Sequence, residues 1–549
     1  MTPNKSSRRS CDLCYTKRLK CDAQKPRCSN CEMYTSECTF GVTSRKAKNR
    51  RQSNSVAISP LQSQIDCLES RLAEVLQRME RLESLAAQTD TPSSPSLPVV
   101  GHHSNGGTPL IGEPNRFSME LPPLQETLSA VEKYLATSNA FLPLFHSGNL
   151  LLSVHRWYSH PAQRSCSTWA TINMVLALAY CQLDSGTESP VRKPASYLNN
   201  AQSVLTELTI RDVDLRSVQV LVAMVMVFQG ALDLGPPTLL IATALRLAHG
   251  LGLHTRSAST ELDTSMALER DHIFWIIYIL DRDLSLRTKR PPLQAETEID
   301  VDLPPEEPDG DDAGFLAIGN GHFNFLRARV QLAHIQGRLY NCLHSVQAQY
   351  ATPEERNEEL ARIRQLLNSW SSRVPPQFTL SALSQSGMPT VSRYFGVLYA
   401  TRITCLSLAS QANPMENRWL ESLQAYGRSR VANMLDISVS LPLDWQGLVH
   451  ECREFMAFYM TVQRKDPSFI WMTACAYIAC LVCVAANGLL YPHHDTIDHD
   501  KNLSTSALLF VEETVLQTSD ERLERLRDAC KELMLQASFL SQEGRSKDE

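Results

Sequence analysis

The chain has 549 residues, of which 43% are apolar and 20% charged, a length that excludes one ordinary domain and a composition typical of an average soluble protein. Its net charge of −6 is unevenly spread, because residues 1–60 hold 13 Lys and Arg against 4 Asp and Glu, whereas the remainder holds 40 against 55. A basic head on an acidic body indicates a polyanionic partner for the head alone.

Six of the 16 cysteines follow the spacing C-x2-C-x6-C-x6-C-x2-C-x6-C near the start of the chain. They are Cys11, Cys14, Cys21, Cys28, Cys31 and Cys38. No apolar stretch follows Met1, so we expect no secretory signal and a reducing compartment, where dense cysteines are more often metal ligands than disulfides. Because zinc prefers four tetrahedral ligands, six thiolates satisfy two zinc ions if two of them bridge. The spacing therefore predicts two zinc ions per chain, with a disulfide-linked mini-domain as the alternative.

The two halves of this cysteine cluster differ in charge. A basic segment lies between the second and third cysteines and comprises Lys17, Arg18 and Lys20, whereas the matching segment of the second half holds Glu32 and Glu37 and no basic residue. Only the first half suits double-stranded DNA, and arginine can bind guanine O6 and N7 with two hydrogen bonds. We expect the basic residues of this first half to contact DNA; solvated charges on a structural zinc knot are the alternative.

Residues 41–60 form a basic linker after the cluster domain, which we place at residues 1–40. Its cations are Arg45, Lys46, Lys48, Arg50 and Arg51. They are predicted to lie along DNA phosphates, to serve as a nuclear import signal, or both. A basic loop without a function is the alternative.

Residues 61–88 carry an apolar repeat that steps by four and three residues in alternation. Its positions are Leu61, Ile65, Leu68, Leu72, Val75, Met79, Leu82 and Ala86. This 3.5-residue period predicts a short parallel coiled coil and hence a dimer, in which Arg78 faces Glu83 of the second copy. An amphipathic helix docked on its own chain is the alternative. A two-fold dimer would present two DNA-binding heads, at a separation governed by residues 39–60.

The rest of the chain divides into a linker, a large body and a tail. Residues 89–120 are rich in Pro, Ser and Gly and predict a flexible tether. Over residues 121–540 apolar residues recur at helical spacing, few alternating runs suggest strands, and residues 541–549 form a tail. The body is therefore predicted to be all-α. The clearest helical segments are Thr171–Cys181, Val218–Leu234, Leu239–Leu253, His272–Leu286, Phe395–Leu408 and Ile470–Tyr491.

The uncharged run Phe469–Tyr491 is long enough to span a bilayer, but its Ala, Cys, Thr, Asn and Gly content favours a buried core helix. We predict no membrane segment. Cys480 and Cys483 within this run are predicted to be buried thiols. The following cluster of His and Asp at residues 493–500 is interpreted as a polar loop, with a metal site as the weaker alternative. Since no phosphate-binding glycine loop or nucleophile motif is present, we predict that the chain is not an enzyme.

The cysteine spacing resembles the fungal zinc binuclear cluster family, and the resemblance covers Cys11–Cys38. It implies that Cys11 and Cys28 are the bridging ligands. It also implies that Lys17 and Arg18 enter the major groove and read a CGG-type triplet, with Lys20 matching a lysine of the family.

Two segments of the body resemble the middle homology region of the same family. One is Ala244–His254; the other is Glu269–Pro291, through Arg270, Trp275, Tyr278, Asp281, Arg282, Ser285, Arg290 and Pro291. The helical spacing of this second set indicates core packing around a partly buried Asp281–Arg282 charge network.

The resemblance implies a nuclear transcription factor that regulates RNA polymerase II genes, for example a metabolic or biosynthetic set, and that works with the transcription machinery or co-regulators. A small-molecule effector of the body is suggested by analogy alone. Two other classes remain as alternatives: a metabolite sensor or enzyme tethered by a zinc head, and a zinc-stapled protein–protein adaptor.

Overall fold

The chain divides into two compact units, residues Met1–Pro114 and Asn115–Glu549, which we describe separately. The computed structural model describes residues 11, 14, 21–33, 38–39, 119–181, 194–211, 213–230, 233–259, 262–308, 313–414, 418–434, 438–442, 444–462, 467–518 and 520–548. In the first unit these residues surround the cysteines and include one short helix, α2 (Ser29–Met33).

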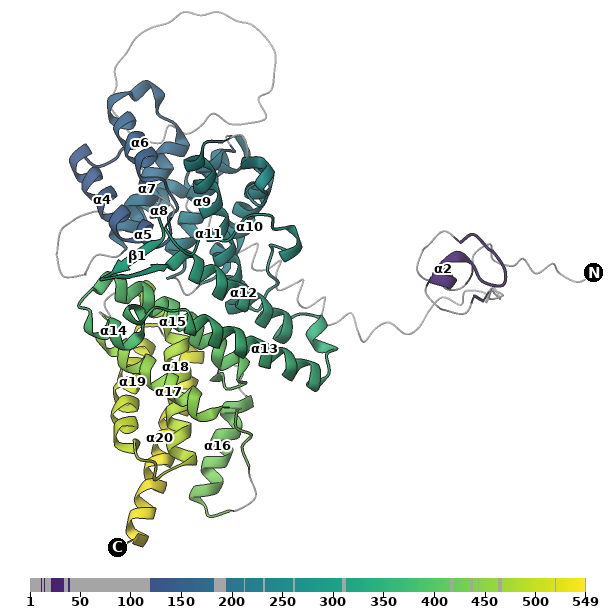
Figure 1. Cartoon of the computed structure of the whole chain (residues 1–549), viewed down its shortest axis with the longest axis vertical. Coiled ribbons are helices and arrows are strands. Elements are labelled where there is room, and N and C mark those ends of the chain that lie inside the picture. Colours follow the sequence, from purple (N-terminus) through teal and green to yellow (C-terminus); the bar gives the residue numbers. More distant parts are fainter. Residues whose placement is uncertain are drawn as a thin grey trace, which may run out of the picture. The chain divides into compact units, whose positions relative to one another are not determined.

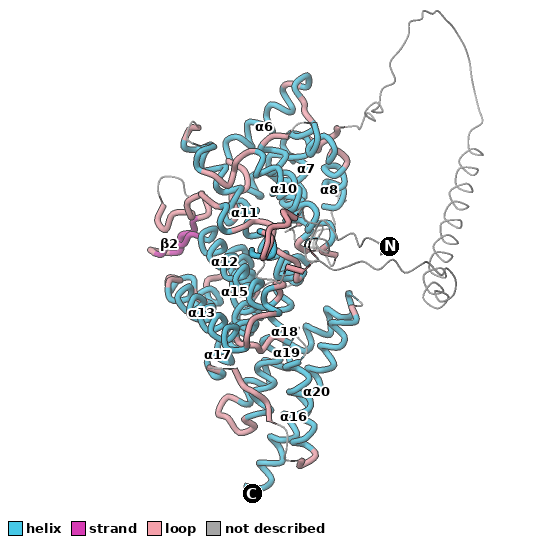
Figure 2. The backbone as a smooth tube through the Cα atoms, turned by 90° about the vertical axis from the view of Figure 1, so that its right-hand side faces the viewer, coloured by secondary structure: helices cyan, strands magenta, loops and turns pink. Residues whose placement is uncertain are grey.

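The second unit is a body of α-helices with a single short hairpin in its described part (Figures 1 and 2). Its first helices are α4 (Leu124–Ala136), α5 (Ser138–Phe141), α6 (Ser147–Ser159), α7 (Cys166–Tyr180), α8 (Pro194–Gln202), α9 (Leu215–Phe228), α10 (Gly235–Gly250) and α11 (Thr264–Thr288). The hairpin and the following helices are β1 (Phe315–Ile318), β2 (Gly321–Asn324), α12 (Phe325–Leu343), α13 (Pro353–Ser372), α14 (Leu380–Gln385) and α15 (Pro389–Ala409). The last helices are α16 (Arg418–Val431), α17 (Trp445–Thr461), α18 (Pro467–Leu490), α19 (Ile497–Thr518) and α20 (Glu521–Asp548).

Two hydrophobic cores lie within this body, one built mainly from α4–α11 and the other mainly from α13–α20. Helix α12 lies between the two sets of helices (Figure 1) and contributes to both cores. Its Leu326 and Val330 belong to the first core, whereas Leu332 and Ile335 belong to the second. A helix that is apolar on two faces is buried between two layers, so α12 is the seam of the body.

Several helices begin at side chains that satisfy the free N–H groups of the first turn. The Asp263 carboxylate accepts a hydrogen bond from the Met266 N–H at the start of α11, at 2.8 Å. Helix α13 begins with a reciprocal capping box between Thr352 and Glu355. These caps fix the first turns of α11 and α13, two helices that also line a cleft in the body.

The hairpin is the one element of the described body that the sequence analysis did not anticipate. The strands are antiparallel, with Phe315 opposite Asn324 and Ile318 opposite Gly321. The two-residue turn places Gly319 at φ +57°, a conformation that favours glycine. The side chain of Phe323 is buried against the aromatic rings of the second core, which explains why so short a hairpin is retained.

The prediction of an all-α body is confirmed, and each of the six segments predicted to be helical lies largely within a helix. Helix α18 is long and apolar enough to cross a membrane, but 78% of its most apolar window is buried inside the body, as expected of a core helix. Helix α20 continues to Asp548, past the boundary at residue 540 where we expected a tail, because the chain stays free of Pro in this part.

Candidate metal centre and DNA-binding head

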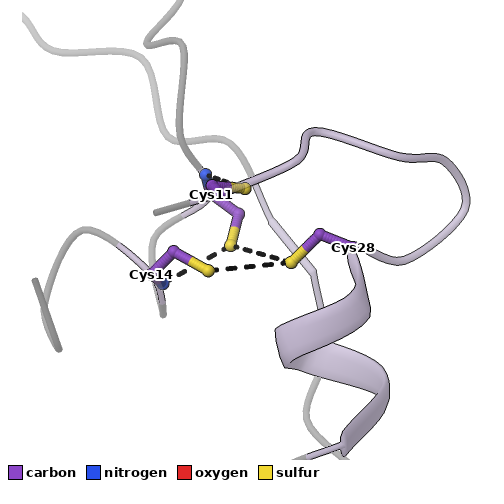
Figure 3. Close-up of side chains that lie close together, drawn as sticks. Cys11, Cys14 and Cys28 are labelled. Carbon is purple, nitrogen blue, oxygen red and sulfur yellow. Dashed lines mark hydrogen bonds between the residues drawn. The ribbon is translucent and has the colours of Figure 1, made fainter. Parts of the chain in front are cut away.

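The six cysteine sulfurs gather into one compact cluster in the first unit. The sulfurs fall into two groups of four, and within each group all ligand atoms lie within 4.8 Å of one another. One group is Cys11, Cys14, Cys21 and Cys28, and the other is Cys11, Cys28, Cys31 and Cys38. The two groups share Cys11 and Cys28, whose sulfurs are 3.6 Å apart (Figure 3).

The polypeptide around the two shared sulfurs is arranged to stabilise thiolates. The backbone N–H of Cys14 donates to Cys11 Sγ at 3.4 Å, and the N–H of Cys31 donates to Cys28 Sγ at 3.4 Å. These hydrogen bonds lower the pKa of Cys11 and of Cys28 below the ordinary thiol value. Because thiolate is the form that binds metal, the shared positions are well suited to ligands.

The link between the two halves of the cluster is fixed to the second half through Asp22. Its carboxylate accepts hydrogen bonds from the backbone N–H of Ser29, at 3.2 Å, and from the Ser29 hydroxyl. The Ser29 hydroxyl lowers the pKa of Asp22. Asp22 thereby ties the link to the first turn of α2. No spacing or motif in the sequence marks Asp22 for this role.

The other predicted residues of the head lie outside the described residues. These are the DNA-contacting Lys17, Arg18 and Lys20, the basic linker residues Arg45, Lys46, Lys48, Arg50 and Arg51, and the heptad positions Leu61, Ile65, Leu68, Leu72, Val75, Met79, Leu82 and Ala86. Their assigned roles remain predictions.

The predicted charge network of the body is confirmed within helix α11. Asp281 and Arg282 are 3% and 2% exposed and form an ion pair of 2.7 Å. Arg282 also donates to the Gln294 carbonyl at 2.6 Å and to Glu296 at 2.8 Å, so it fastens α11 to the loop that follows. Nearby, the Trp275 indole donates to the Asp302 carbonyl at 2.9 Å. The motif thus acts as a structural clamp, as expected.

The His and Asp cluster at residues 493–500 and the pair Cys480 and Cys483 both contribute to the packing of the body. The buried Asp500 carboxylate lies 2.7 Å from Arg453 Nε and 2.8 Å from His494 Nε2. Part of the His and Asp cluster is therefore an ion-pair network. Cys480 and Cys483 are buried as predicted; burial raises the pKa of the Cys480 thiol, and the hydrogen bond with Cys452, followed by burial, raises the pKa of the Cys483 thiol. Within the described part of the chain, neither group is among the clusters whose ligand atoms all lie close enough together to hold a metal ion.

Two family models match the chain. Residues 9–47 match the fungal Zn(2)-Cys(6) binuclear cluster domain, and residues 131–372 match the fungal specific transcription factor domain. The first match contains all six clustered cysteines, and the second contains the clamp of α11. The chain belongs to the fungal zinc-cluster transcription factors.

Similar proteins in several fungi carry related names. The chain is 25% identical to an "ABC-transporter-regulating transcription factor" of Aspergillus oryzae and 24% identical to one of Aspergillus fumigatus, in each case over 95% of this chain and 72% of the relative. It is 29% identical to the "Fusaridione A cluster transcription factor" of Fusarium heterosporum, over 48% of this chain and 50% of the relative. No solved structure gives a significant match. This zinc-cluster transcription factor is a zinc-binding, sequence-specific transcription regulator.

Proposed function

We propose that this zinc-cluster transcription factor acts in the nucleus as a homodimer that reads paired CGG-type triplets. The observation that carries the proposal is the sharing of Cys11 and Cys28 by two four-sulfur groups. Two zinc ions per chain then hold the head rigid, with these two thiolates bridging, because about 40 residues bury too little surface to fold without metal. Chelation of the zinc should therefore abolish the folded head.

The division of labour along the chain follows from charge and periodicity. Lys17 and Arg18 project into the major groove, with Arg18 on a guanine, while Lys20 and the basic linker contact phosphates. Residues 61–88 pair two chains and residues 89–120 connect the dimer to the regulatory body at residues 121–540. The linker cations also direct nuclear import.

The regulated genes belong to a metabolic or biosynthetic set transcribed by RNA polymerase II. The names of the relatives support this range, since two refer to regulation of ABC transporters and one to a fusaridione A cluster. The body responds to a small-molecule effector and passes the response to the transcription machinery or co-regulators. It has no enzymatic role.

Selection of bound sequences from a random duplex pool by the full-length protein tests the proposal. We expect enrichment of paired CGG-like triplets, and we expect Arg18→Ala to relax the preference at one base pair at a cost of about 1–3 kcal/mol. Lys46→Ala is the matched control: it should weaken binding to all sequences and reduce the salt dependence. If no sequence is enriched, the DNA-reading function is refuted in favour of a zinc-stapled protein–protein adaptor. An Arg18→Ala variant with an unchanged sequence preference refutes base recognition by Arg18.

A further inference from the structure

An open cleft of about 430 Å³ lies between α11, α12, α13 and the loop that follows α11. Its volume falls within the range of sites that hold small organic molecules. Tyr278 and Val330 on its walls belong to the first core, whereas Ile335 and Trp370 belong to the second. The cleft therefore lies at the seam of the body, where a bound molecule would touch both cores at once.

The walls of the cleft are mainly aromatic and aliphatic. The indole N–H of Trp275 donates to the Asp302 carbonyl at 2.9 Å and that of Trp370 donates to the Ala328 carbonyl at 3.2 Å. Since both N–H groups are already satisfied, these rings contribute only apolar surface to a ligand. Leu303 at the rim is 46% exposed, although it is large and apolar. Together they favour a ligand with an apolar ring or branched chain.

The carboxylate on the cleft wall is already provided with donors. Tyr278 Oη donates to Glu296 at 2.7 Å, Arg282 donates at 2.8 Å, and His334 Nδ1 lies 3.5 Å away. Burial alone would raise the pKa of Glu296, but the hydrogen bonds from His334, Tyr278 and Arg282 lower it to about 2. Glu296 is therefore charged at neutral pH and already neutralised by its neighbours, so it has little left to attract a cation.

The arginine that lines the cleft has no such compensation. Arg373 follows the last residue of α13, its side chain is exposed, and it lines the cleft. No hydrogen bond or ion pair holds its guanidinium within the described part of the chain, in contrast to Arg362 on the same helix, which pairs with Glu358 and Glu359. A guanidinium at the rim of an apolar cleft is suited to a carboxylate or another planar anion.

We propose that this cleft binds a small apolar molecule bearing one anionic group, with its apolar part between Trp275 and Trp370 and its anion paired with Arg373. The proposal deepens the effector response proposed above and rests on it for its biological meaning. Binding itself is a property of the cleft alone. Because the ligand contacts both cores, it stabilises one arrangement of the two halves of the body.

The test compares two fluorescent probes that differ in one group: 8-anilino-1-naphthalenesulfonate and its uncharged parent, N-phenyl-1-naphthylamine. Both are titrated into the full-length protein. We expect one saturable site per chain for each probe and tighter binding of the sulfonate. Arg373→Gln should weaken the sulfonate about tenfold and leave the uncharged probe unchanged. Arg362→Gln, on the same helix but outside the cleft, should change neither.

A second pair of variants tests whether the probes occupy the cleft itself. Ser369→Trp places an indole at a position that lines the cleft, and it should abolish binding of both probes. Asn368→Trp adds the same bulk to the adjacent exposed position outside the cleft and should leave both affinities intact. Melting curves confirm that each variant is folded.

Three outcomes would overturn the proposal: the absence of a saturable site, probe affinities unchanged by Ser369→Trp, or equal effects of Arg373→Gln on the two probes. Selection of DNA sequences by the same wild-type protein keeps the two hypotheses separate. If the wild-type protein lacks a saturable probe site but selects triplets normally, the cleft proposal alone is refuted. If it binds both probes as expected but selects no triplets, the DNA-binding function alone is refuted.

Discussion

Arg282 on α11 lies directly over Gly337 on α12: a Cβ atom added at Gly337 would come within 2.9 Å of Arg282 Nε and 3.2 Å of Arg282 Cδ. Arg282 cannot move aside freely, because its guanidinium is held by Asp281, the Gln294 carbonyl and Glu296. The absence of a side chain at residue 337 is therefore what lets the buried ion pair and the seam helix pack together.

Gly337→Ala should lower the free energy of unfolding of the body by about 1–3 kcal/mol, because the added methyl group overpacks a fixed contact. Urea titration followed by circular dichroism measures the change. Gly250→Ala, at the exposed end of α10 where a Cβ meets nothing within 4 Å, is the control and should be neutral or stabilise by up to about 1 kcal/mol. Equal effects of the two substitutions would contradict the contact.

Asp271 predicts a pH dependence of stability. Burial, reinforced by the nearby Asp302 carboxylate, raises the pKa of Asp271 to about 6, above its ordinary value of 3.8. Between these two values the folded state binds more protons than the unfolded state, so stability falls as the pH rises from about 4 to about 6. Asp271→Asn should therefore raise the Tm at pH 7 and change it little at pH 4.

Thermal melting of wild type and variant at both pH values measures this difference. Asp495→Asn alters an exposed carboxylate and should shift the Tm by similar small amounts at pH 4 and pH 7. A larger gain for Asp271→Asn at pH 4 than at pH 7 would reverse the expected sign and refute the assignment.

Zinc content distinguishes shared from unshared ligands in the cluster. Cys28 belongs to both four-sulfur groups, whereas Cys21 belongs to one. We expect Cys28→Ser to lose both zinc ions and Cys21→Ser to retain more metal, as measured by mass spectrometry of the purified full-length protein. The same zinc content in the two variants would argue against a bridging Cys28, and fewer than two zinc ions in the wild type would argue against the two-metal cluster.

The heptad segment predicts the oligomeric state. Leu72→Pro should abolish dimers, because proline interrupts the helix at the centre of the apolar stripe. Analytical ultracentrifugation of the full-length protein provides the measurement, with Gln77→Ala at a solvent-facing heptad position as the control. A Leu72→Pro variant that remains dimeric and binds paired triplets normally would assign dimerisation to another part of the chain.

The sequence predicts the helical body well because apolar periodicity is a local property. Segments such as Val218–Leu234 carry it without help from distant residues. The hairpin at residues 315–324 was missed because each strand has only four residues, too few for alternation to be recognised, and its retention depends on the burial of Phe323 by distant rings. Long-range packing, rather than local sequence, therefore determines that this hairpin forms.

The same distinction applies to the sites. Cysteine spacing predicts which side chains bind metal, because all six ligands lie within one segment of 28 residues, Cys11–Cys38, where their type and number can be recognised directly. The cleft had no such signal, since Trp275, Glu296 and Trp370 come from three separate elements and only folding brings them together. The uncompensated charge of Arg373 likewise becomes visible only once its surroundings are known.

Because α12 contributes to both cores, it also limits where this body can be cut into fragments that fold. A chain that ended before Phe325 would leave the first core without Leu326, Val330 and Ala333, and a chain that began after Leu343 would leave the second without Leu332, Ile335 and Leu339. Either fragment would expose an uncovered apolar surface to water and aggregate. Insertions and truncations at α12 therefore disrupt the folding of both cores together, and the two halves of the body form a single folding unit.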